Sequence, residues 1–318
     1  MLPPRDYPKE YPIMDLISNW NPDNTEIPAQ HYDSLCHFDF SDPQQLKAAE
    51  NYRKAELPFI VYNIPEVDGV VKKWSDIDYL NKRLKNQRYR SETANSNHFM
   101  YFRENRRNKA IGVNGTEERW DPPTGTTQIT FEDWLKVAVR GQSEPDISKR
   151  EHIYFRVTAP DSKGPNKWLF EELDFFQPKK SFFMVSPSEQ RGIHCRFGMR
   201  SIIAECHYDG SRNMVAELGG LRRWIMSHPK NCKSMYLLPP KHPSGRHSDV
   251  DWSNPNLYTY PQFSNTLANE IILKPGDVLY VPTSWFHFIV SLNVNFQCNT
   301  RSGRALTYTK DLQKCGFN

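Results

Sequence analysis

The stretch RSIIAECHYDGSRNMVAELG, Arg200 to Gly219, decides the fold class of this chain. It holds two short apolar runs, RSIIAECHY and NMVAEL, separated by a polar, glycine-containing turn, which is typical of two neighbouring strands. Such strands, separated by turn signals, predict a β-sandwich or barrel, and the jelly-roll class can hold a ligand in its open end. The other runs of this kind, from about His152 onward, are HIYFRVT, SFFMV, RRWIM, SMYLL, EIILK, DVLYVP, HFIVSL and FQCNT.

The first half of the chain predicts a mixture of helices and strands. PFIVYNI (Pro58 to Ile64) is an apolar β-rich run, and the stretch from Asn105 to Thr127, rich in Gly, Pro and charge, should form a long loop. We therefore expect a mixed α+β fold dominated by β, with α/β elements over 1–150 packed on a double-stranded β-helix (jelly-roll) over 151–303, and a short tail over 304–318. Helices are predicted for QQLKAAENYRK after Ser41-Asp42-Pro43, for a segment that starts at Ser75 with Asp78 and runs through Leu84, and for FEDWLKVAV after Thr130 with Asp133.

Composition and charge are those of a globular protein. The chain has 318 residues, of which 38% are hydrophobic and 25% charged, enough to bury a sizeable core. It has no apolar run of about 18 residues, so no membrane span is predicted. The N-terminus has no apolar signal core, which favours a cytoplasmic or nuclear protein, although the secretory pathway stays open if a leader precedes this sequence.

The net charge of +4 is too mild to point to nucleic acid by itself. The densest basic run is more typical of a solvated loop than of a surface for an acidic partner, so nucleic acid is not the expected partner. This run consists of Arg103, Arg106, Arg107 and Lys109.

The six cysteines form no C-x-x-C pair and no zinc-finger spacing. Cys206 and Cys298 lie in apolar, strand-like runs, and we expect both to be buried thiols. An even number of cysteines does not establish any disulfide by itself.

The short motif His207-Tyr208-Asp209 supplies two candidate metal ligands. Residues i and i+2 of a strand project from the same face, so one imidazole and one carboxylate should point together into the predicted barrel. A second histidine, His287, follows in VPTSWFHFIVSL. Two histidines and one carboxylate leave three positions of an octahedral ion open, which is the ligand set of non-haem iron(II) oxygenases. An H-x-D motif alone is common, and more often forms a structural hydrogen bond.

Longer stretches around these residues resemble a known family. FGMRSIIAECHYDGSRNMVAELGGLRRW (Phe197 to Trp224) and KPGDVLYVPTSWFHFIVSL (Lys274 to Leu292) are similar to the metal-binding segments of cupin-like JmjC oxygenases. MYLLPPKHPSGRHSDVDWSNPNLYTYPQF between them is similar to the insert of the factor-inhibiting-HIF (asparaginyl hydroxylase) type. The resemblance implies an iron(II)- and 2-oxoglutarate-dependent dioxygenase that uses O2. It also implies that His207, Asp209 and His287 hold the metal, with no catalytic residue beyond these ligands.

The same resemblance implies a pocket for 2-oxoglutarate. In this family a lysine pairs with the distal carboxylate of the co-substrate, and Arg222 stands at its position. Arginine can make a bidentate contact with a carboxylate, so the exchange is chemically sensible. Arg223 takes the role if the register shifts by one residue, and Ala204 replaces a threonine that donates a hydrogen bond in the family. The other residues that the resemblance assigns to the pocket are Tyr154, Asn213 and Asn299.

The expected reaction is hydroxylation of a protein or peptide side chain. The alternatives are an N-methyl-lysine demethylase or methyl-lysine hydroxylase of the JmjC type, a tRNA-modifying oxygenase, and a non-enzymatic cupin-like binding protein. Release of formaldehyde, a hydroxylated product, or no turnover of 2-oxoglutarate would distinguish these. The family's dimer is built from C-terminal helices, and the few residues after Gly303 are too short for a helix pair, so a monomer is expected.

Overall fold

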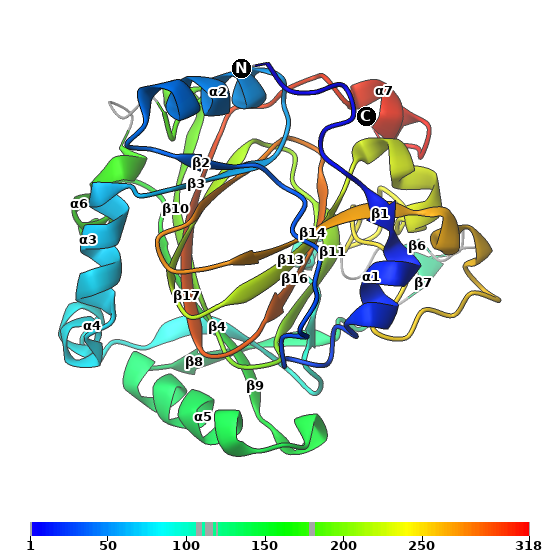
Figure 1. Ribbon diagram of the computed structural model, residues 1–318. Helices are drawn as coiled ribbons and strands as arrows, with labels where there is room; N and C mark the ends of the chain where they lie inside the picture. Colours follow the sequence, from blue (N-terminus) through cyan, green and yellow to red (C-terminus); the bar gives the residue numbers. More distant parts are fainter. Residues whose placement is uncertain (1, 106–109, 112–116, 119, 178–181, 318) are drawn as a thin grey trace.

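Eight consecutive strands form the core of the protein, in a computed structural model that describes residues 2–105, 110–111, 117–118, 120–177 and 182–317. They are divided between two sheets, in the orders β15-β12-β17-β10 and β14-β13-β16-β11, and consecutive strands alternate between the sheets except for β13 and β14, which pair with each other. This is the jelly-roll arrangement (Figure 1). The predicted fold class is therefore confirmed. The strands are β10 (Gln190–Gly198), β11 (Ile203–Tyr208), β12 (Asn213–Gly219), β13 (Arg222–Ser227), β14 (Leu267–Leu273), β15 (Val278–Val281), β16 (Phe286–Ser291) and β17 (Asn295–Ser302).

Strands from the first 159 residues extend both core sheets. In the larger sheet β3 (Phe59–Tyr62) and β2 (His37–Asp39) continue beyond β15, while β9 (His152–Ala159), β4 (Tyr89–Ala94) and β8 (Thr124–Ile129) continue beyond β10. The N-terminal region thus shares its sheets with the jelly roll. In the smaller sheet β1 (Tyr11–Pro12) lies beside β14 and β5 (His98–Phe99) beside β11, and a separate pair is formed by β6 (Ala110–Ile111) and β7 (Glu117–Glu118).

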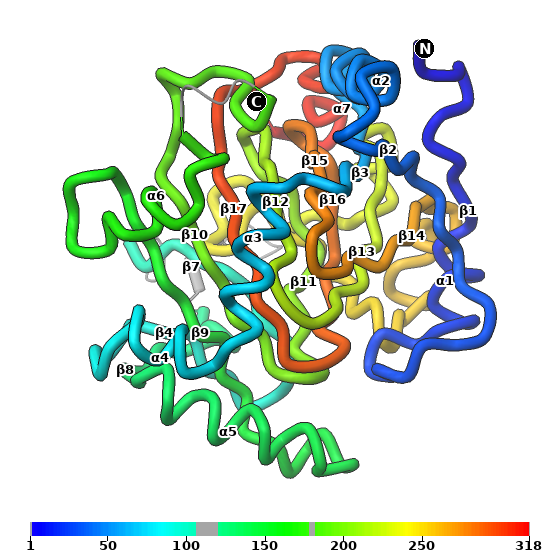
Figure 2. Tube along the Cα trace, turned by 60° about the vertical axis from the view of Figure 1, so that its left-hand side comes forward, coloured from blue at the N-terminus to red at the C-terminus, as the bar shows by residue number. Residues whose placement is uncertain are grey.

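Helices cover the outside of the strands. In Figures 1 and 2, α3 and α4 lie along the outer side of the larger sheet, where α3 packs on β12, and α1 lies beside β14 at the other side. The interior of the barrel is thereby left to side chains of the strands. The helices are α1 (Ile13–Asn19), α2 (Pro43–Lys54), α3 (Pro65–Trp74), α4 (Ile77–Leu84), α5 (Phe131–Ser143), α6 (Trp168–Glu172) and α7 (Thr309–Gln313). No helix in the described ranges is both long and apolar enough to cross a membrane.

The three helices predicted from capping residues are all present. The Asp42 carboxylate caps α2, and the Thr130 hydroxyl caps α5 by accepting a hydrogen bond from the Asp133 amide. The predicted cap of α4 is wrong by one residue, because Asp76, not Ser75, accepts the first amides of the helix. Ser75 instead ends α3, and its amide donates to a carbonyl of that helix.

Two predicted strands are wrong. Residues 182–185 of SFFMV form a turn, and the rings of Phe182 and Phe183 contact Phe40 instead of a neighbouring strand. In SMYLL, the 3-10 helix η5 (Pro229–Met235) occupies the start, and Tyr236 has a φ of 47°, which an extended strand does not allow. Both runs have the apolar composition of strands, but each lies in a connection outside the hydrogen-bonded ladders.

The predicted loop from Asn105 to Thr127 is only partly a loop, because β8 begins at Thr124 and the short strands β6 and β7 lie within it. Arg106, Arg107 and Lys109 of the basic run lie outside the described residues.

The cysteines correct one prediction. Cys206 is a buried free thiol as expected, but Cys298 is bonded to Cys195 and is therefore no thiol. Those two residues lie directly opposite each other in β17 and β10, which is why a bond can form between them. A second disulfide joins Cys232 in η5 to Cys315 after α7. Spacing along the sequence did not indicate either pairing.

Replacing both Cys232 and Cys315 by serine is expected to lower the free energy of unfolding by about 2–4 kcal/mol, because the bond restricts the unfolded chain. Urea denaturation under non-reducing conditions measures the change. Cys36→Ser, at a half-buried free cysteine, is the matched control and should change the free energy by less than about 1 kcal/mol. Equal stability of the double variant and the parent protein would contradict the prediction.

Candidate metal centre

Three side chains with metal-binding atoms meet inside the jelly roll. His207 lies near the end of β11, Asp209 follows that strand directly, and His287 belongs to β16. In the antiparallel pairing of these strands His207 lies opposite His287, and their ring centroids are 4.3 Å apart. One ligand atom from each of the three residues lies within 4.8 Å of the others. The structure therefore brings together the donors that the sequence pattern singled out.

Both histidines are oriented by backbone carbonyls. Nδ1 of His207 lies 2.8 Å from the carbonyl oxygen of Glu205, and Nδ1 of His287 lies 3.0 Å from that of Trp285. A neutral ring in such a contact carries its proton on Nδ1, which leaves the lone pair of Nε2 for a metal ion. Two imidazoles with a carboxylate suit a divalent iron, so the donor chemistry fits this ion.

The protonation states of the three residues agree with metal binding. Burial, with smaller contributions from neighbouring His287 and His247, holds the pKa of His207 well below its ordinary value. Burial likewise lowers the pKa of His287. Burial is the largest single influence and would raise the pKa of Asp209, but Arg301, together with smaller contributions from both histidines and Arg246, outweighs it and keeps the pKa below the ordinary range. At neutral pH the site thus offers two neutral imidazoles and one carboxylate.

One oxygen of Asp209 is held by two neighbouring side chains. Oδ2 of Asp209 accepts from Nε of Arg301 at 3.0 Å and from Nδ2 of Asn213 at 3.3 Å, and Nη2 of Arg301 lies 2.8 Å away. These contacts all go to Oδ2, which leaves Oδ1 as the oxygen available for a metal ion. Outer partners of this kind fix the orientation of a metal-binding carboxylate.

A chain of side-chain amides runs from Asp209 into the barrel. Asn213 accepts at Oδ1 from Nδ2 of Asn299 at 2.8 Å, and Asn299 accepts at Oδ1 from Nη1 of Arg196 at 3.3 Å. The two asparagines named from the sequence are therefore in contact with each other, one of them directly beside the carboxylate. Arg196 extends the same network from β10.

Tyr154 and Arg222 lie deeper in the barrel and are hydrogen-bonded to each other. Nη1 of Arg222 donates to the Tyr154 hydroxyl at 2.9 Å and to Oε1 of Gln297 at 2.7 Å. Nε of Arg222 donates to Oδ1 of Asn295, and Nη2 donates to the carbonyl oxygen of Arg196 at 3.1 Å. Arg222 is fully buried, so its guanidinium is enclosed by protein acceptors.

Arg223 points to the other side of β13. Its guanidinium forms an ion pair with Glu270 and donates to the carbonyl oxygen of Trp20 at 2.7 Å. Its role is therefore to hold α1 against the smaller sheet, away from the metal-binding residues.

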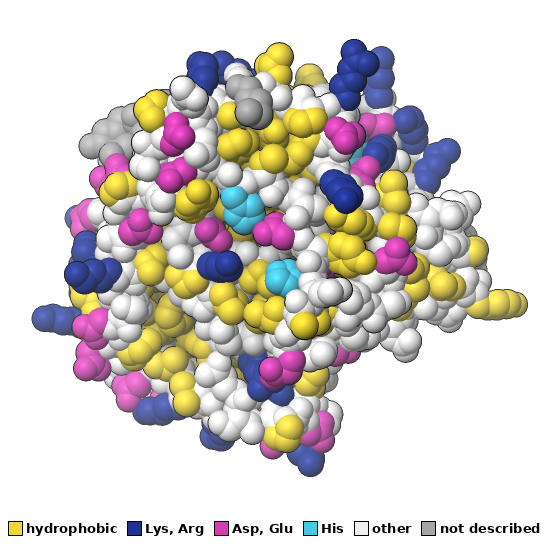
Figure 3. Space-filling model, viewed as in Figure 1, with side chains coloured by type: hydrophobic (Ala, Val, Ile, Leu, Met, Phe, Trp, Pro, Cys, Tyr) yellow, Lys and Arg dark blue, Asp and Glu magenta, His cyan; other side chains and the backbone are white. Residues whose placement is uncertain are grey.

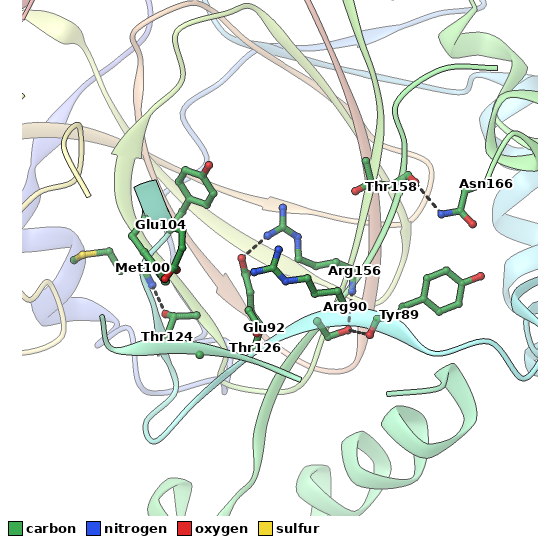
Figure 4. Close-up of a pocket in the computed structure, with 14 residues that line it drawn as sticks. Tyr89, Arg90, Glu92, Met100, Glu104, Thr124, Thr126, Arg156, Thr158 and Asn166 are labelled. Atoms are coloured by element: carbon green, nitrogen blue, oxygen red, sulfur yellow. Dashed lines mark hydrogen bonds and ion pairs between the residues drawn. The ribbon is translucent and has the colours of Figure 1, made fainter. Parts of the chain in front are cut away.

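A small cavity of about 70 Å³ lies against His207, Asp209 and His287, the three candidate metal-binding side chains. Tyr154, Ala204, Asn213 and Asn299 line it, together with residues that sequence reasoning did not name. A larger cleft of about 530 Å³ adjoins the cavity, since Glu92 and Tyr101 line both. Figure 4 shows this cleft, with Glu92 paired to Arg156 and Arg90 beside them. The three candidate metal-binding residues thus lie next to a cleft along β4 and β9.

Sequence reasoning missed three functional candidates at this site. Arg301 follows Asn299 by two positions in β17. Because residues two apart in a strand face the same way, strand alternation could have indicated that Arg301 lies on the same face as Asn299. Arg196 lies in β10, which was not predicted as a strand. His247 lies in the long connection between β13 and β14, and its ring stacks on His207 with centroids 4.9 Å apart. Nothing in the sequence indicated that His247 would return to the barrel.

Comparison with known proteins agrees with this geometry. The cupin-like domain family matches residues 43–301 of the chain. From Danio rerio, the tRNA wybutosine-synthesizing protein 5 is 28% identical over 183 residues, covering 54% of this chain and 52% of that protein. Lysine-specific demethylase 8 of the same organism is 31% identical over 188 residues, covering 58% and 42%.

HSPB1-associated protein 1 of Rattus norvegicus is 33% identical over 154 residues, covering 43% of this chain and 32% of that protein. The aligned region thus spans about half, or less, of the length of these curated relatives. The match over most of the chain, together with the jelly-roll topology, shows that this chain belongs to the cupin-like domain family, with relatives of the JmjC type.

Proposed function

We propose that this chain is an iron(II)- and 2-oxoglutarate-dependent dioxygenase that hydroxylates a side chain of a protein or peptide. The observation that carries the proposal is the convergence of His207, Asp209 and His287, with ligand atoms within 4.8 Å of one another. Bound iron(II) would couple the oxidative decarboxylation of 2-oxoglutarate by O2 to the hydroxylation of a C–H bond. We propose the factor-inhibiting-HIF type as the form of this chemistry to test first, because the segment between β13 and β14 resembles the insert of that type.

The residues around the donors have separate tasks in this proposal. The backbone carbonyls hold both imidazoles ready for the metal, while Arg301 holds the outer oxygen of Asp209. Asn213 and Asn299 line the cavity next to Asp209, and we assign them to the 2-oxo acid end of the co-substrate. We assign the distal carboxylate to Tyr154 and Arg222, because a charge buried at that depth requires a cation and a hydrogen-bond donor.

The charge of the cavity favours a neutral or acidic target over a methylated lysine. Arg196 and Arg301 line the cavity together with Asp209 and Glu92. Asp209 pairs with Arg301 and Glu92 with Arg156, so Arg196 adds a positive charge that no ion pair among the described residues balances. A methylated lysine keeps its positive charge, and bringing it beside these guanidinium groups would cost Coulomb energy. Demethylation remains the second candidate, because two of the relatives are named lysine-specific demethylases.

A tRNA substrate is the third candidate, and it rests on the name of one relative. On the face shown in Figure 3, the Lys and Arg side chains of the described residues are scattered over the face and its edge, with acidic side chains between them. A nucleic-acid surface usually concentrates its basic residues on one face. The face shown therefore gives little support to a tRNA substrate.

Purified protein supplied with iron(II), ascorbate, 2-oxoglutarate and candidate peptides tests the proposal. We expect succinate formation that a peptide substrate stimulates, and a peptide product that is heavier by one oxygen atom in mass spectrometry. The matched control is the same protein supplied with zinc(II), which can occupy the site but performs no redox chemistry.

Each alternative has its own outcome in this experiment. Formaldehyde release from a methylated peptide would identify a demethylase, and oxidation of tRNA but of no peptide would identify an RNA-modifying enzyme. Absence of succinate under every condition would overturn the oxygenase assignment and leave a binding protein.

A further inference from the structure

The segment 304–317, which follows β17, packs on the strands that carry the candidate metal-binding residues. Tyr208 lies between two of these residues, and strand alternation turns its ring to the face opposite theirs. The ring of Phe317 meets the Tyr208 ring edge-on, with centroids 5.7 Å apart. Phe286, which precedes His287, meets the same ring at 5.6 Å. Phe317 is buried, so it closes an aromatic cluster directly behind the metal-binding side chains.

A second aromatic side chain of this segment lies against the turn before β16. The Tyr308 ring contacts the Trp285 ring edge-on, with centroids 6.3 Å apart, and its hydroxyl donates to the carbonyl oxygen of Glu56 at 2.7 Å. Trp285 is fully buried, and its carbonyl oxygen is the one that lies 3.0 Å from Nδ1 of His287. Phe317 and Tyr308 therefore pack against residues that set the orientation of the metal-binding side chains.

The placement of these two rings depends on a covalent link to another part of the chain. The helix of the segment, α7, has five residues, and a helix of that length is not stable by itself in water. Cys315, two residues before Phe317, is bonded to Cys232 of η5, beside which α7 lies (Figure 1). Leu312 adds a buried apolar contact, but the disulfide is what fixes the chain next to Phe317.

The two disulfides of the protein differ in their access to solvent. Cys195 and Cys298 are both buried, on paired strands that the ladder of backbone hydrogen bonds holds together in any case. Cys315 is only partly buried, so a reductant can reach the second bond from its side. A dithiol breaks that bond by delivering two electrons and two protons, which gives two cysteine thiols while the dithiol itself becomes a disulfide. Of the two bonds, Cys232–Cys315 is thus the one exposed to the redox environment.

We propose that Phe317 and Tyr308 are positioning residues for the metal-binding side chains, and that the Cys232–Cys315 disulfide makes their position depend on oxidation. This inference rests on the proposed function and adds redox control of the same site. With the bond formed, the two rings support the metal-binding strands from behind. With the bond reduced, the segment is free to leave, and the metal donors lose more conformational freedom when they bind an ion, so metal affinity falls. The site would therefore be complete in an oxidising compartment and weakened in a reducing one.

Titration with cobalt(II) tests the inference without turnover, because the visible absorption of bound cobalt reports the arrangement of its ligands. The parent protein is titrated before and after treatment with dithiothreitol, which is removed before the metal is added. Thiol alkylation and mass spectrometry of an aliquot identify the bond that has opened. We expect the Cys232–Cys315 bond alone to open, the dissociation constant of cobalt to rise roughly tenfold, as for loss of an outer partner, and the spectrum to change. Reoxidation should restore both.

Variants separate the disulfide from the rings that it positions. The double variant Cys232→Ser with Cys315→Ser should bind cobalt as the reduced parent does, and dithiothreitol should have no further effect on it. Phe317→Ala keeps the disulfide and should also lose roughly tenfold in cobalt affinity, and Phe317→Leu, which restores apolar volume, should recover part of the loss. Leu306→Ala is the matched control, because Leu306 belongs to the same segment but is 70% exposed, and it should change neither affinity nor spectrum.

Unchanged cobalt affinity and spectrum after the bond has opened would overturn the inference. So would a bond that dithiothreitol does not open in the folded protein, an equal response of the double serine variant to the dithiol, or normal cobalt binding by Phe317→Ala. Circular dichroism at the temperature of the titration checks that each protein is folded, and Phe317→Ala, with its disulfide intact, decides the matter if the double variant is not. Failure of the oxidised parent to bind cobalt would instead contradict the proposed function, so the two failures are distinguishable.

Discussion

Asp209→Ala is expected to abolish the turnover of 2-oxoglutarate. It should also weaken metal binding by more than the ~10–100-fold that is typical when a residue hydrogen-bonded to a metal ligand is lost. Asp209 is the anionic member of the three donors, so its removal takes away the negative charge that attracts the metal ion. It also frees Arg301, whose guanidinium now contacts Oδ2. The variant therefore places an uncompensated positive charge beside the site that must bind a cation.

Succinate formation and calorimetric titration with a divalent metal measure the two effects. Arg301→Gln is a matched control, because it keeps the carboxylate and removes only its partner. We expect that control to lose roughly 10–100-fold in metal affinity while retaining measurable turnover. Normal succinate formation by Asp209→Ala would show that the metal, if any, is held elsewhere.

Arg222→Ala should raise the apparent constant for 2-oxoglutarate by two to three orders of magnitude. Truncating one side of a buried charge pair costs about 3–5 kcal/mol, and about 1.4 kcal/mol corresponds to a tenfold change. Metal affinity should be largely unchanged, because Arg222 lies outside the group of metal donors. Arg222→Lys should recover part of the loss, since a lysine fills this position in the family that the sequence resembles.

Arg223→Ala tests whether Arg223 stabilises the fold, as its ion pair with Glu270 indicates, or binds 2-oxoglutarate in place of Arg222. Adjacent residues of a strand face opposite ways, and Arg223 forms a buried ion pair with Glu270 instead of facing the cavity. We expect this variant to lose about 3–5 kcal/mol of folding stability, while its folded fraction keeps a normal constant for 2-oxoglutarate. Denaturant unfolding and initial-rate kinetics measure the two quantities. A raised constant in Arg223→Ala with a normal one in Arg222→Ala would reverse the assignment.

The features that the sequence predicted well are those set by local patterns. His207 and Asp209 are two positions apart near the end of one strand, so alternation was enough to place them together, and the resemblance supplied His287. The starts of α2 and α5 depend on the chemistry of Asp42 and Thr130 within one helical turn. Such features need no knowledge of the rest of the chain.

The features that the sequence did not predict depend on contacts between distant segments. β10 was missed because QRGIHCRFG mixes charged residues and glycine, and its apolar alternation is short. Arg196 was missed with it. SMYLL has the composition of a strand, but Pro229 and the backbone of Tyr236 make that region a 3-10 helix and a turn. The bond of Cys298 requires the β10–β17 register, which no sequence spacing reveals.

That bond has a consequence for the cavity as well as for stability. Cys195 directly precedes Arg196, and Cys298 lies between Gln297 and Asn299, so the disulfide joins the two backbones from which the polar side chains project. A covalent tie at this position limits the fluctuations of both strands before any ligand arrives. The two strands would then lose less conformational entropy when a ligand binds in the cavity, which is what preorganisation means in physical terms. We therefore expect the disulfide to act on the cavity through the two strands that it joins.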